Sequence, residues 1–311
     1  MGSSTIDYFA GAGGFTLGAT SAGVEVVAAV NHWRLAVDTH RENHPSALHL
    51  CEDLTRFDPA LLPEADGLVA SPACQGHARA RGVAAGSAGD SRWDASRATA
   101  WSVIDYAEVR RPAWIVVENV TDFQRWALFP TWLDALSRLG YATRVQVCDA
   151  ALWGVPQHRP RVIVTALRGR REAPAVEPPS GVALAPVGAV IDWSAGVWSP
   201  VATKVAATRA RVERGRSAFG PRFVMPYNGS GSGLTGRSLD RPLGTVTAAD
   251  RWAVVDGDVM RMLAVGELAA AMGFPSTYKL PPQREHATKM LGNAIVPVLA
   301  EAAVRACTEA A

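Results

Sequence analysis

Cysteine is scarce in this sequence, and its cysteines are far apart. Cys51, Cys74, Cys148 and Cys307 form no Cys-x-x-Cys pair within the 311 residues. This spacing argues against a zinc site and against a disulfide scaffold, and it is typical of proteins in a reducing compartment. We therefore expect no bound metal and a cytoplasmic location.

Long hydrophobic runs are also missing. No uninterrupted apolar run approaches the roughly 18 residues that a membrane-spanning helix needs. The first residues, Met1 to Ser4, carry no basic flank of the kind that begins a signal peptide. Ile6 stands where the myristoylation pattern requires Ser or Thr. These absences predict a soluble protein with no membrane partner.

Charge of either sign is not in excess. The sequence has 31 Lys and Arg residues against 29 Asp and Glu residues, a net charge of +2. The overall charge therefore does not indicate a nucleic-acid partner, and any basic surface has to come from local clustering. Hydrophobic residues make up 48% and charged residues 19% of the chain, as in a globular protein with a sizeable core.

Short apolar runs alternate with amphipathic or polar stretches in the first half of the chain. The apolar runs cover residues 6–10, 24–30, 67–70, 114–117, 143–147 and 162–166, and helical patterns cover 15–21, 96–109 and 131–139. This alternation predicts an α/β fold with a mostly parallel, doubly wound sheet. Ligands bind at the carboxyl ends of such strands, so we expect a polar edge at residues 11–14, 31–32, 72–76 and 118–119.

The composition changes after Leu167. Residues 168–200 are rich in Pro, Gly and Ala, which predicts a linker. A basic segment at 204–222 and a Gly-rich loop at 227–238 follow, and helical periodicity returns at 259–272 and 293–307. We therefore expect a smaller, irregular basic domain and a helical return to the first domain.

The stretch DYFAGAGGFTLG predicts a strand, a tight glycine turn and a helix. Gly11, Gly13 and Gly14 would let the backbone approach a ligand closely. The dinucleotide fingerprint requires glycine where Thr16 stands and a ribose-binding acid where Asn31 stands. These two positions argue against a nicotinamide dehydrogenase, and a glycine turn without a ligand remains an alternative.

Cys74 follows a predicted strand in the stretch SPACQGHARARG. Pro72 would stiffen the backbone before it, and Gly76 would permit a sharp turn after it. Arg79 and Arg81 would raise the thiolate fraction of a nearby thiol. The local sequence thus indicates either a nucleophile or a structural cysteine.

Glu118 ends the very apolar stretch AWIVV, and an arginine pair begins a later strand. Burial at a strand end would favour the protonated form of Glu118, which suits proton donation. Alternation predicts Arg159 and Arg161 on the same side of their strand, where they would suit phosphate, carboxylate or a carbonyl oxygen. A partnered strand-end acid and a surface arginine pair are the alternatives.

Taken in order, the motifs resemble one family. Six motifs occur in the order and at the spacings found in bacterial and phage cytosine-5 DNA methyltransferases. They are DYFAGAGG, SPACQG, ENV, QHRPR, RPLGTVTA and GNAIVPVLAEA. The resemblance spans almost the whole chain and is weakest over 169–240. It implies a Rossmann-like methyltransferase sheet with a second, smaller target-recognition domain. The catalytic, S-adenosylmethionine-binding domain would be residues 1–168 plus 286–311, and residues 169–285 would form the recognition domain and hinge.

The resemblance also implies the reaction and the residues that perform it. S-adenosylmethionine would methylate C5 of a cytosine flipped out of double-stranded DNA. Cys74 would add to C6, Glu118 would hydrogen-bond or protonate N3, and Arg161, with Arg159, would hold the O2 side. The implied donor-binding residues are Phe9, Gly11, Gly13, Gly14, Asn31, His32, Asp53, Leu54, Pro72, Asn293 and Ala294. The implied DNA-contacting residues are Gln75, Gly76, Arg79, Arg81, Arg209, Arg211, Arg214, Arg216, Thr245 and Thr247.

The chain departs from the commonest family pattern around the cysteine and after the second strand. Ala73 replaces a second proline, His77 and Ala78 replace an aromatic residue and a serine, and Asn31 replaces an acid. None of these departures removes a catalytic atom. Action on RNA cytosine, use of a modified donor, and a catalytically silent DNA-binding relative remain alternatives, although the full catalytic set argues against the silent protein. We expect a monomer associated with the nucleoid.

Overall fold

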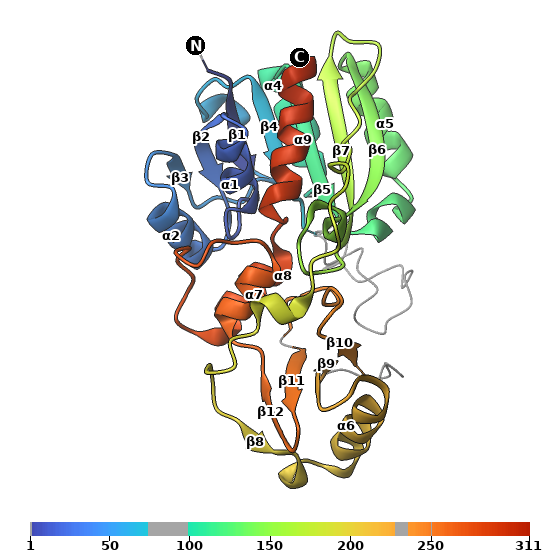
Figure 1. Cartoon of the computed structure of the whole chain (residues 1–311). Coiled ribbons are helices and arrows are strands. Elements are labelled where there is room, and N and C mark those ends of the chain that lie inside the picture. Colours follow the sequence, from blue (N-terminus) through green and yellow to red (C-terminus); the bar gives the residue numbers. More distant parts are fainter. Residues whose placement is uncertain (1, 74–98, 228–235, 250) are drawn as a thin grey trace. The chain divides into compact units, whose positions relative to one another are not determined.

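The computed structural model describes residues 2–73, 99–227, 236–249 and 251–311 (Figure 1). The chain divides into two compact units. Unit 1 comprises Met1–Asp149, Pro160–Pro178 and Ala294–Ala311, and unit 2 comprises Ala150–Arg159 and Pro179–Asn293. Residues 150–159 and 286–293, which the sequence division placed in the larger domain, group with the smaller unit. Residues 169–178 group with the larger one.

Unit 1 is built on a seven-stranded sheet in the order β3-β2-β1-β4-β5-β7-β6. Its strands are β1 (Ser4–Tyr8), β2 (Glu25–Val30), β3 (Leu48–Leu50), β4 (Gly67–Ala70), β5 (Trp114–Asn119), β6 (Tyr141–Asp149) and β7 (Pro160–Arg168). The first five are parallel, and β7 runs antiparallel to both β5 and β6. Every residue of β4 and β5 is buried, as expected for strands covered on both faces. The predicted doubly wound α/β sheet is confirmed.

Helices cover both faces of this sheet. They are α1 (Gly14–Ser21), α2 (Arg34–Asn43), α4 (Trp101–Arg110), α5 (Phe129–Arg138) and α9 (Pro297–Ala310). In Figure 1, α1 and α9 lie in front of the sheet and α4 and α5 lie behind it. Tyr106 of α4 and Trp132 of α5 are completely buried in the core cluster formed with the sheet. The apolar strands therefore hold the polar residues that follow them in fixed positions at the sheet edge.

Two glycines of α1 let α9 and the residues just before it approach the α1 backbone. A Cβ atom at Gly14 would lie 2.2 Å from the carbonyl oxygen of Ile295, and one at Gly18 would lie 2.6 Å from Cβ of Ala300. No side chain fits at these distances, so any larger residue would push the two helices apart. The predicted return of the C-terminal segment to the first domain is thus a direct packing of α9 on α1.

Unit 2 contains a five-stranded antiparallel sheet in the order β10-β9-β11-β12-β8. Its elements are β8 (Ser199–Pro200), α6 (Ala206–Phe219), β9 (Arg222–Pro226), β10 (Arg237–Ser238), β11 (Trp252–Asp256), β12 (Val259–Met262), α7 (Val265–Ala271) and α8 (Arg284–Asn293). Short 3₁₀ turns occur in both units: Pro59–Leu61 and Thr121–Arg125 in unit 1, and Ala150–Trp153, Val187–Val190 and Val201–Thr203 in unit 2. Residues of α6 and of the sheet form one core cluster. The expectation of an irregular small domain was wrong.

The helix expected over 259–272 was wrong in its first part. β11 and β12 form a hairpin joined at Gly257, which has a left-handed φ of 55°. The two-residue turn is the Gly-Asp pair at 257–258, a hairpin signal that outweighs the helical periodicity of the residues after it. The helix α7 begins only at Val265.

One stretch, Arg284–Ala310, is long and apolar enough by length and composition to cross a membrane, with a mean hydropathy of 1.4. Inside the protein 67% of its apolar window is buried, and the stretch is divided into α8 and α9 by residues 294–296. Counting uninterrupted apolar residues did not identify it, because charged residues lie within it. A core helix gives the same signal, so the stretch is weak evidence for a membrane span.

Candidate active site

The glycine turn follows β1 directly and has an unusual backbone. Phe9, Gly11 and Gly13 all have left-handed φ values, of 61°, 53° and 82°. Gly13 caps α1, which begins at Gly14. A non-glycine residue in this conformation costs of order 1–3 kcal/mol, and such strain concentrates at functional sites. Phe9 is therefore the predicted donor-site residue whose backbone gives the clearest functional signal.

Asn31 and His32 follow β2 at the same edge of the sheet. Oδ1 of Asn31 accepts the backbone N–H of Trp33 at 2.9 Å, which turns the chain into α2. The carbonyl of Asn31 accepts the N–H of Glu52 at 3.2 Å, so the segment after β3 lies beside it. His32 is exposed. The structure thus brings the residues after β2 and β3 together.

Asp53 and Leu54 follow β3. The hydroxyl and the N–H of Thr55 donate to Oδ1 of Asp53 at 2.8 and 3.0 Å, and these hydrogen bonds hold the pKa of that exposed carboxyl below its usual value. Asp53 is therefore a carboxylate at neutral pH. Leu54 is buried in the core cluster beneath the sheet edge, so its side chain supports the edge from inside.

Glu118 and Arg161 meet at the carboxyl end of β5. Glu118 pairs in register with Ile163, which places the beginning of the antiparallel β7 beside it. Nε of Arg161 lies 3.0 Å from Oε1 of Glu118, and both side chains are almost fully buried. A buried carboxylate requires such a partner. Sequence reasoning named both residues but did not predict that they form an ion pair.

Asn119 links this ion pair to the segment that leads to Cys74. Its Nδ2 donates to the carbonyl oxygen of Pro72 at 3.0 Å, and Ala73 N–H donates to Oγ1 of Thr99 at 3.0 Å. The end of β4 is thus tied to Glu118 through the next residue of β5. Sequence reasoning quoted Asn119 within ENV but assigned it no role, although its position after a buried strand was the available signal.

Cys74, Gln75, Gly76, Arg79 and Arg81 lie outside the described residues, as do His77 and Ala78. The cysteines that the structure does describe provide a contrast. Burial raises the pKa of the Cys148 thiol to about 11 and that of Cys307 to about 12. These two thiols stay protonated at neutral pH and are poor nucleophiles.

Arg159 does not share a strand with Arg161. β7 begins at Pro160, and Arg159 groups with unit 2. Its Nη1 donates to Val246 O at 2.7 Å and its Nη2 to Gly292 O at 2.8 Å, with 1% of the residue exposed. The predicted alternation of the two arginines on one strand face was therefore wrong, because the strand starts one residue later than expected.

The segment RPLGTVTA is bound to the residues around Arg159. Gln157 accepts the Val246 N–H at 2.7 Å and donates to Ala271 O at 3.0 Å, and Thr245 donates to His158 O at 2.8 Å. Thr247 donates to Ala249 O at 2.9 Å. Both threonine hydroxyls thus bond to the backbone within unit 2, where they shape a loop.

The arginines predicted to contact DNA on α6 differ in their surroundings. Arg209, Arg211 and Arg216 donate to backbone carbonyls of unit 2, and Arg216 also pairs with Asp258 at 2.9 Å. Arg214 is exposed and makes no hydrogen bond or ion pair to the described part of the chain. Of the four, Arg214 has the side chain best placed to meet an external phosphate.

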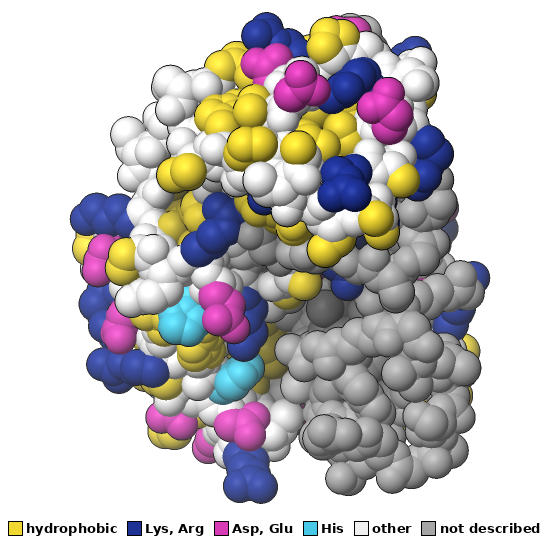
Figure 2. Space-filling view, turned by 90° about the horizontal axis from the view of Figure 1, so that it is seen from below, with side chains coloured by type: hydrophobic (Ala, Val, Ile, Leu, Met, Phe, Trp, Pro, Cys, Tyr) yellow, Lys and Arg dark blue, Asp and Glu magenta, His cyan; other side chains and the backbone are white. Residues whose placement is uncertain are grey.

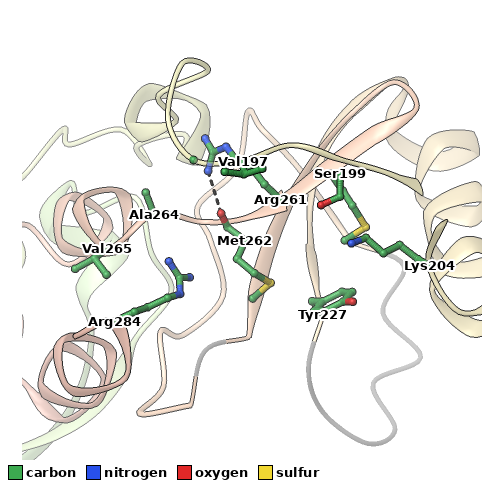
Figure 3. A pocket seen from close by; sticks show the side chains of 11 residues that line it. Val197, Ser199, Lys204, Tyr227, Arg261, Met262, Ala264, Val265 and Arg284 are labelled. Atoms are coloured by element: carbon green, nitrogen blue, oxygen red, sulfur yellow. Dashed lines mark hydrogen bonds between the residues drawn. The ribbon is translucent and has the colours of Figure 1, made fainter. Parts of the chain in front are cut away.

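A cavity of about 360 Å³ lies in unit 2 (Figure 3). Lys204, Arg261, Arg284, Tyr227 and Met262 are among its lining side chains. Two 2.7 Å bonds to Glu267 neutralise Arg261. The lining otherwise combines apolar groups with basic ones.

Basic side chains are dispersed elsewhere on the surface. In the view of Figure 2, Lys and Arg occur at many separate places over the described residues, often beside Asp or Glu. This distribution agrees with the net charge of +2. Among the described residues no group of three or more His, Cys, Asp or Glu side chains is placed to hold a metal ion.

Asn293 is the last residue of unit 2 along the chain, and Ala294 begins the final segment of unit 1. Asn293 is the exposed last residue of α8, and Ala294 is buried in unit 1. A Cβ atom at the preceding residue, Gly292, would lie 2.1 Å from Ala248 N, so a larger residue would not fit at position 292. Ile295 then packs on Gly14 at the start of α1.

Comparison with known proteins identifies the family. The profile of C-5 cytosine-specific DNA methylases matches residues 3–183 and 205–309. The Type II methyltransferase M.HgiDI of Herpetosiphon aurantiacus is 34% identical over 53% of this chain, and the chain spans about half the length of that relative (52%). The Type II methyltransferase M1.HphI of Haemophilus parahaemolyticus is 28% identical over 97% of this chain and 85% of its own.

Solved structures share the fold over almost the full length. A DNA modification methyltransferase encoded within an Escherichia coli prophage superimposes with a TM-score of 0.71 at 18% identity over 98% of both chains. The Schizosaccharomyces pombe Dnmt2 methyltransferase gives a TM-score of 0.72 at 14% identity over 99% of both. These matches confirm the predicted Rossmann-like methyltransferase fold. With its profile match, the chain belongs to the family of C-5 cytosine-specific DNA methylases.

Proposed function

We propose that this protein transfers a methyl group from S-adenosylmethionine to C5 of a cytosine in double-stranded DNA. The buried Glu118–Arg161 pair, tied through Asn119 to the peptide that precedes Cys74, is the observation that carries this proposal. It brings together the acid Glu118, the cation Arg161 and the residues that lead into Cys74 at one end of the sheet. Relatives described as Type II methyltransferases support the DNA substrate and a role in restriction-modification.

The residues at the sheet edge suit the donor. The left-handed turn from Phe9 to Gly13 presents backbone without Cβ atoms at Gly11 and Gly13, Asn31 offers amide donors and Asp53 offers a carboxylate. These groups match the hydroxyl, amino and carboxylate groups of an adenosylated amino acid. When bound there, S-adenosylmethionine supplies an electrophilic methyl group on a positively charged sulfur.

The chain's own residues would activate the cytosine. The thiolate of Cys74 would form a bond to C6, which makes C5 nucleophilic. The protonated carboxyl of Glu118 would donate its proton to N3, where negative charge collects, and Arg161 would hold Glu118 in place and lie near O2. C5 would then form a bond to the methyl group, whose bond to the donor sulfur would break and leave S-adenosylhomocysteine. A base, such as a bound water, would remove the C5 proton, the bond between C6 and Cys74 would break, and the N3 proton would return to Glu118. Cys74 is thereby regenerated as a thiolate.

Labelled donor would test this function with duplex DNA and with RNA of the same sequences. We expect label in DNA from the wild type, and a loss of at least about 10³-fold in Cys74→Ser, since the reaction then lacks its nucleophile. Cys51→Ser, at a half-buried cysteine, is the matched control and should retain activity. Unchanged transfer by Cys74→Ser would rule out the covalent route.

A duplex that contains 5-fluorocytosine gives an independent readout. Fluorine prevents the final elimination, so the wild type should remain attached to the DNA through Cys74. Label in RNA but not in DNA would instead support the RNA alternative. Donor binding without transfer to either polymer would support the silent relative.

A further inference from the structure

A chain of buried polar side chains lies beside the glycine turn of unit 1. Oγ1 of Thr16 is 2.7 Å from Oδ2 of Asp7 and 2.9 Å from Nε2 of His40. Nδ1 of His40 is 2.8 Å from Nε2 of His49. Asp7, Thr16 and His40 are at most 2% exposed. The proposed transfer reaction uses none of these four residues.

Thr16 is the centre of this chain. It stands where the dinucleotide fingerprint would require a glycine, so its hydroxyl is a feature that the fingerprint could not accommodate. Asp7 lies on β1 and Thr16 on α1, so their hydrogen bond joins the two ends of the turn at residues 9–13. A strained residue such as Phe9 persists only where its surroundings hold it in place.

The protons in this chain can be assigned consistently. With a neutral Asp7, its carboxyl donates to Thr16, Thr16 donates to His40 Nε2, and His40 Nδ1–H donates to His49. With an ionised Asp7, every donation runs in the opposite direction, from His49 towards the carboxylate. One proton fills each hydrogen bond in both cases, so the three bonds persist through a change in the Asp7 charge.

The far end of the chain reaches the residues after β2. His40 on α2 and His49 on β3 line one small pocket together with Gly11 and Asn31. The hydrogen-bonded chain therefore connects the elements that carry the glycine turn and Asn31. These are the elements whose relative position determines the shape of the proposed donor site.

We propose that Thr16 and His40 are positioning residues for the methyl donor. Through the bonds from Asp7 to His49 they fix the turn at residues 9–13 relative to α2 and Asn31, without touching the donor themselves. This inference rests on the proposed function, since it concerns the same donor site. Loss of the Thr16 hydroxyl should weaken donor binding and leave the transfer step at saturating donor intact.

Thr16→Val removes the hydroxyl at nearly constant volume, and Thr16→Ser retains it. Thr5→Val is the matched control, because Thr5 is buried in the same strand as Asp7 and its hydroxyl donates to the backbone carbonyl of Ile6 at 3.3 Å, outside the Asp7–His49 chain. Titration calorimetry with S-adenosylhomocysteine, without DNA, measures the Kd. We expect about a tenfold higher Kd in Thr16→Val, the effect of one hydrogen bond, and wild-type binding in Thr16→Ser and Thr5→Val.

Steady-state kinetics and melting curves separate positioning from general stabilisation. The KM for the donor should rise about as much as the Kd, while kcat changes less than about twofold. His40→Phe, which keeps a ring but breaks two of the bonds, should act in the same direction. A lower melting temperature in Thr16→Val with unchanged Kd and KM would overturn the inference. Failure of the wild-type protein to bind S-adenosylhomocysteine would overturn the proposed function, and this inference with it.

Discussion

The sheet edge of unit 1 and the basic helix α6 of unit 2 both carry polar residues that the sequence marked as functional. At the sheet edge, Glu118 and Arg161 are buried and bond to each other. On α6, three of the four predicted arginines bond to backbone carbonyls of their own unit, and Arg214 is the exposed exception. A polar residue after a buried strand therefore indicates chemistry more reliably than a basic residue on a surface helix.

The largest expected effect is a loss of turnover on substitution of Glu118, in contrast to a loss of stability on substitution of Arg159. Glu118→Gln should lower kcat by about 10²- to 10³-fold, because N3 of the cytosine loses the carboxyl group that would protonate it, with a small change in melting temperature. Arg159→Met should mainly destabilise the fold, since the Val246 and Gly292 carbonyls lose their donors at about 1–3 kcal/mol each. Turnover and thermal unfolding of both variants test the contrast. A stable but inactive Arg159→Met would instead give Arg159 a direct part in the reaction.

A smaller effect on DNA binding is expected for Arg214 of α6, whereas Arg216 of the same helix should affect stability. Arg214→Gln should weaken binding to duplex DNA and reduce the slope of log K against log salt by about one, the signature of one lost phosphate contact. Arg216→Gln is the matched comparison, and it should lower stability by breaking its bonds to Gly257 O and Asp258. Fluorescence anisotropy over a salt series measures the slope. Equal slopes for Arg214→Gln and the wild type would mean that Arg214 contacts no DNA phosphate.

The smallest effect is a dependence of stability on pH within unit 1. Burial raises the pKa of Asp7 from 3.8 to about 7. Between these pH values the folded protein keeps a proton that the unfolded chain has lost, so this stabilisation is complete below about pH 3.8 and declines until about pH 7. Burial also lowers the pKa of His44 from 6.5 to about 4, which works in the opposite direction, since stability then rises with pH over that range.

Asp7→Asn should remove only the first contribution. The difference in unfolding free energy between wild type and variant should therefore fall as pH rises from about 4 to about 7, by at most about 1.4 kcal/mol per unit, and then level off. Urea unfolding at several pH values measures this difference, with Asp134→Asn, at an exposed side chain of α5, as the control. A difference that stays constant with pH would mean that Asp7 ionises in the folded protein as it does in the unfolded chain.

The sequence predicted most of unit 1 because its information is local. Six apolar runs correspond to strands β1, β2, β4, β5, β6 and β7, and only the three-residue β3 lacked a signal of its own. Parallel topology then places the ends of several strands at one edge, so Asn31 and Glu118 could be found without coordinates. The motif order supplied the family.

The rest could not be predicted because it depends on partners distant in the sequence. The role of Asn119 requires the carbonyl of Pro72, 47 residues away, and the bonds of Arg159 require Val246 and Gly292. Likewise, nothing near Thr16 indicates that His40 lies against it. Hydrogen bonds of this kind appear only when the chain has folded.

The contact between Gly14 and Ile295 has a consequence for how the chain is made. Unit 1 is assembled from residues 1–149, 160–178 and 294–311, and the last of these segments is synthesised after the others and packs on α1. The nascent sheet must wait for its covering helix while all of unit 2 is synthesised. During that interval α1 lacks the helix that covers it in the folded protein.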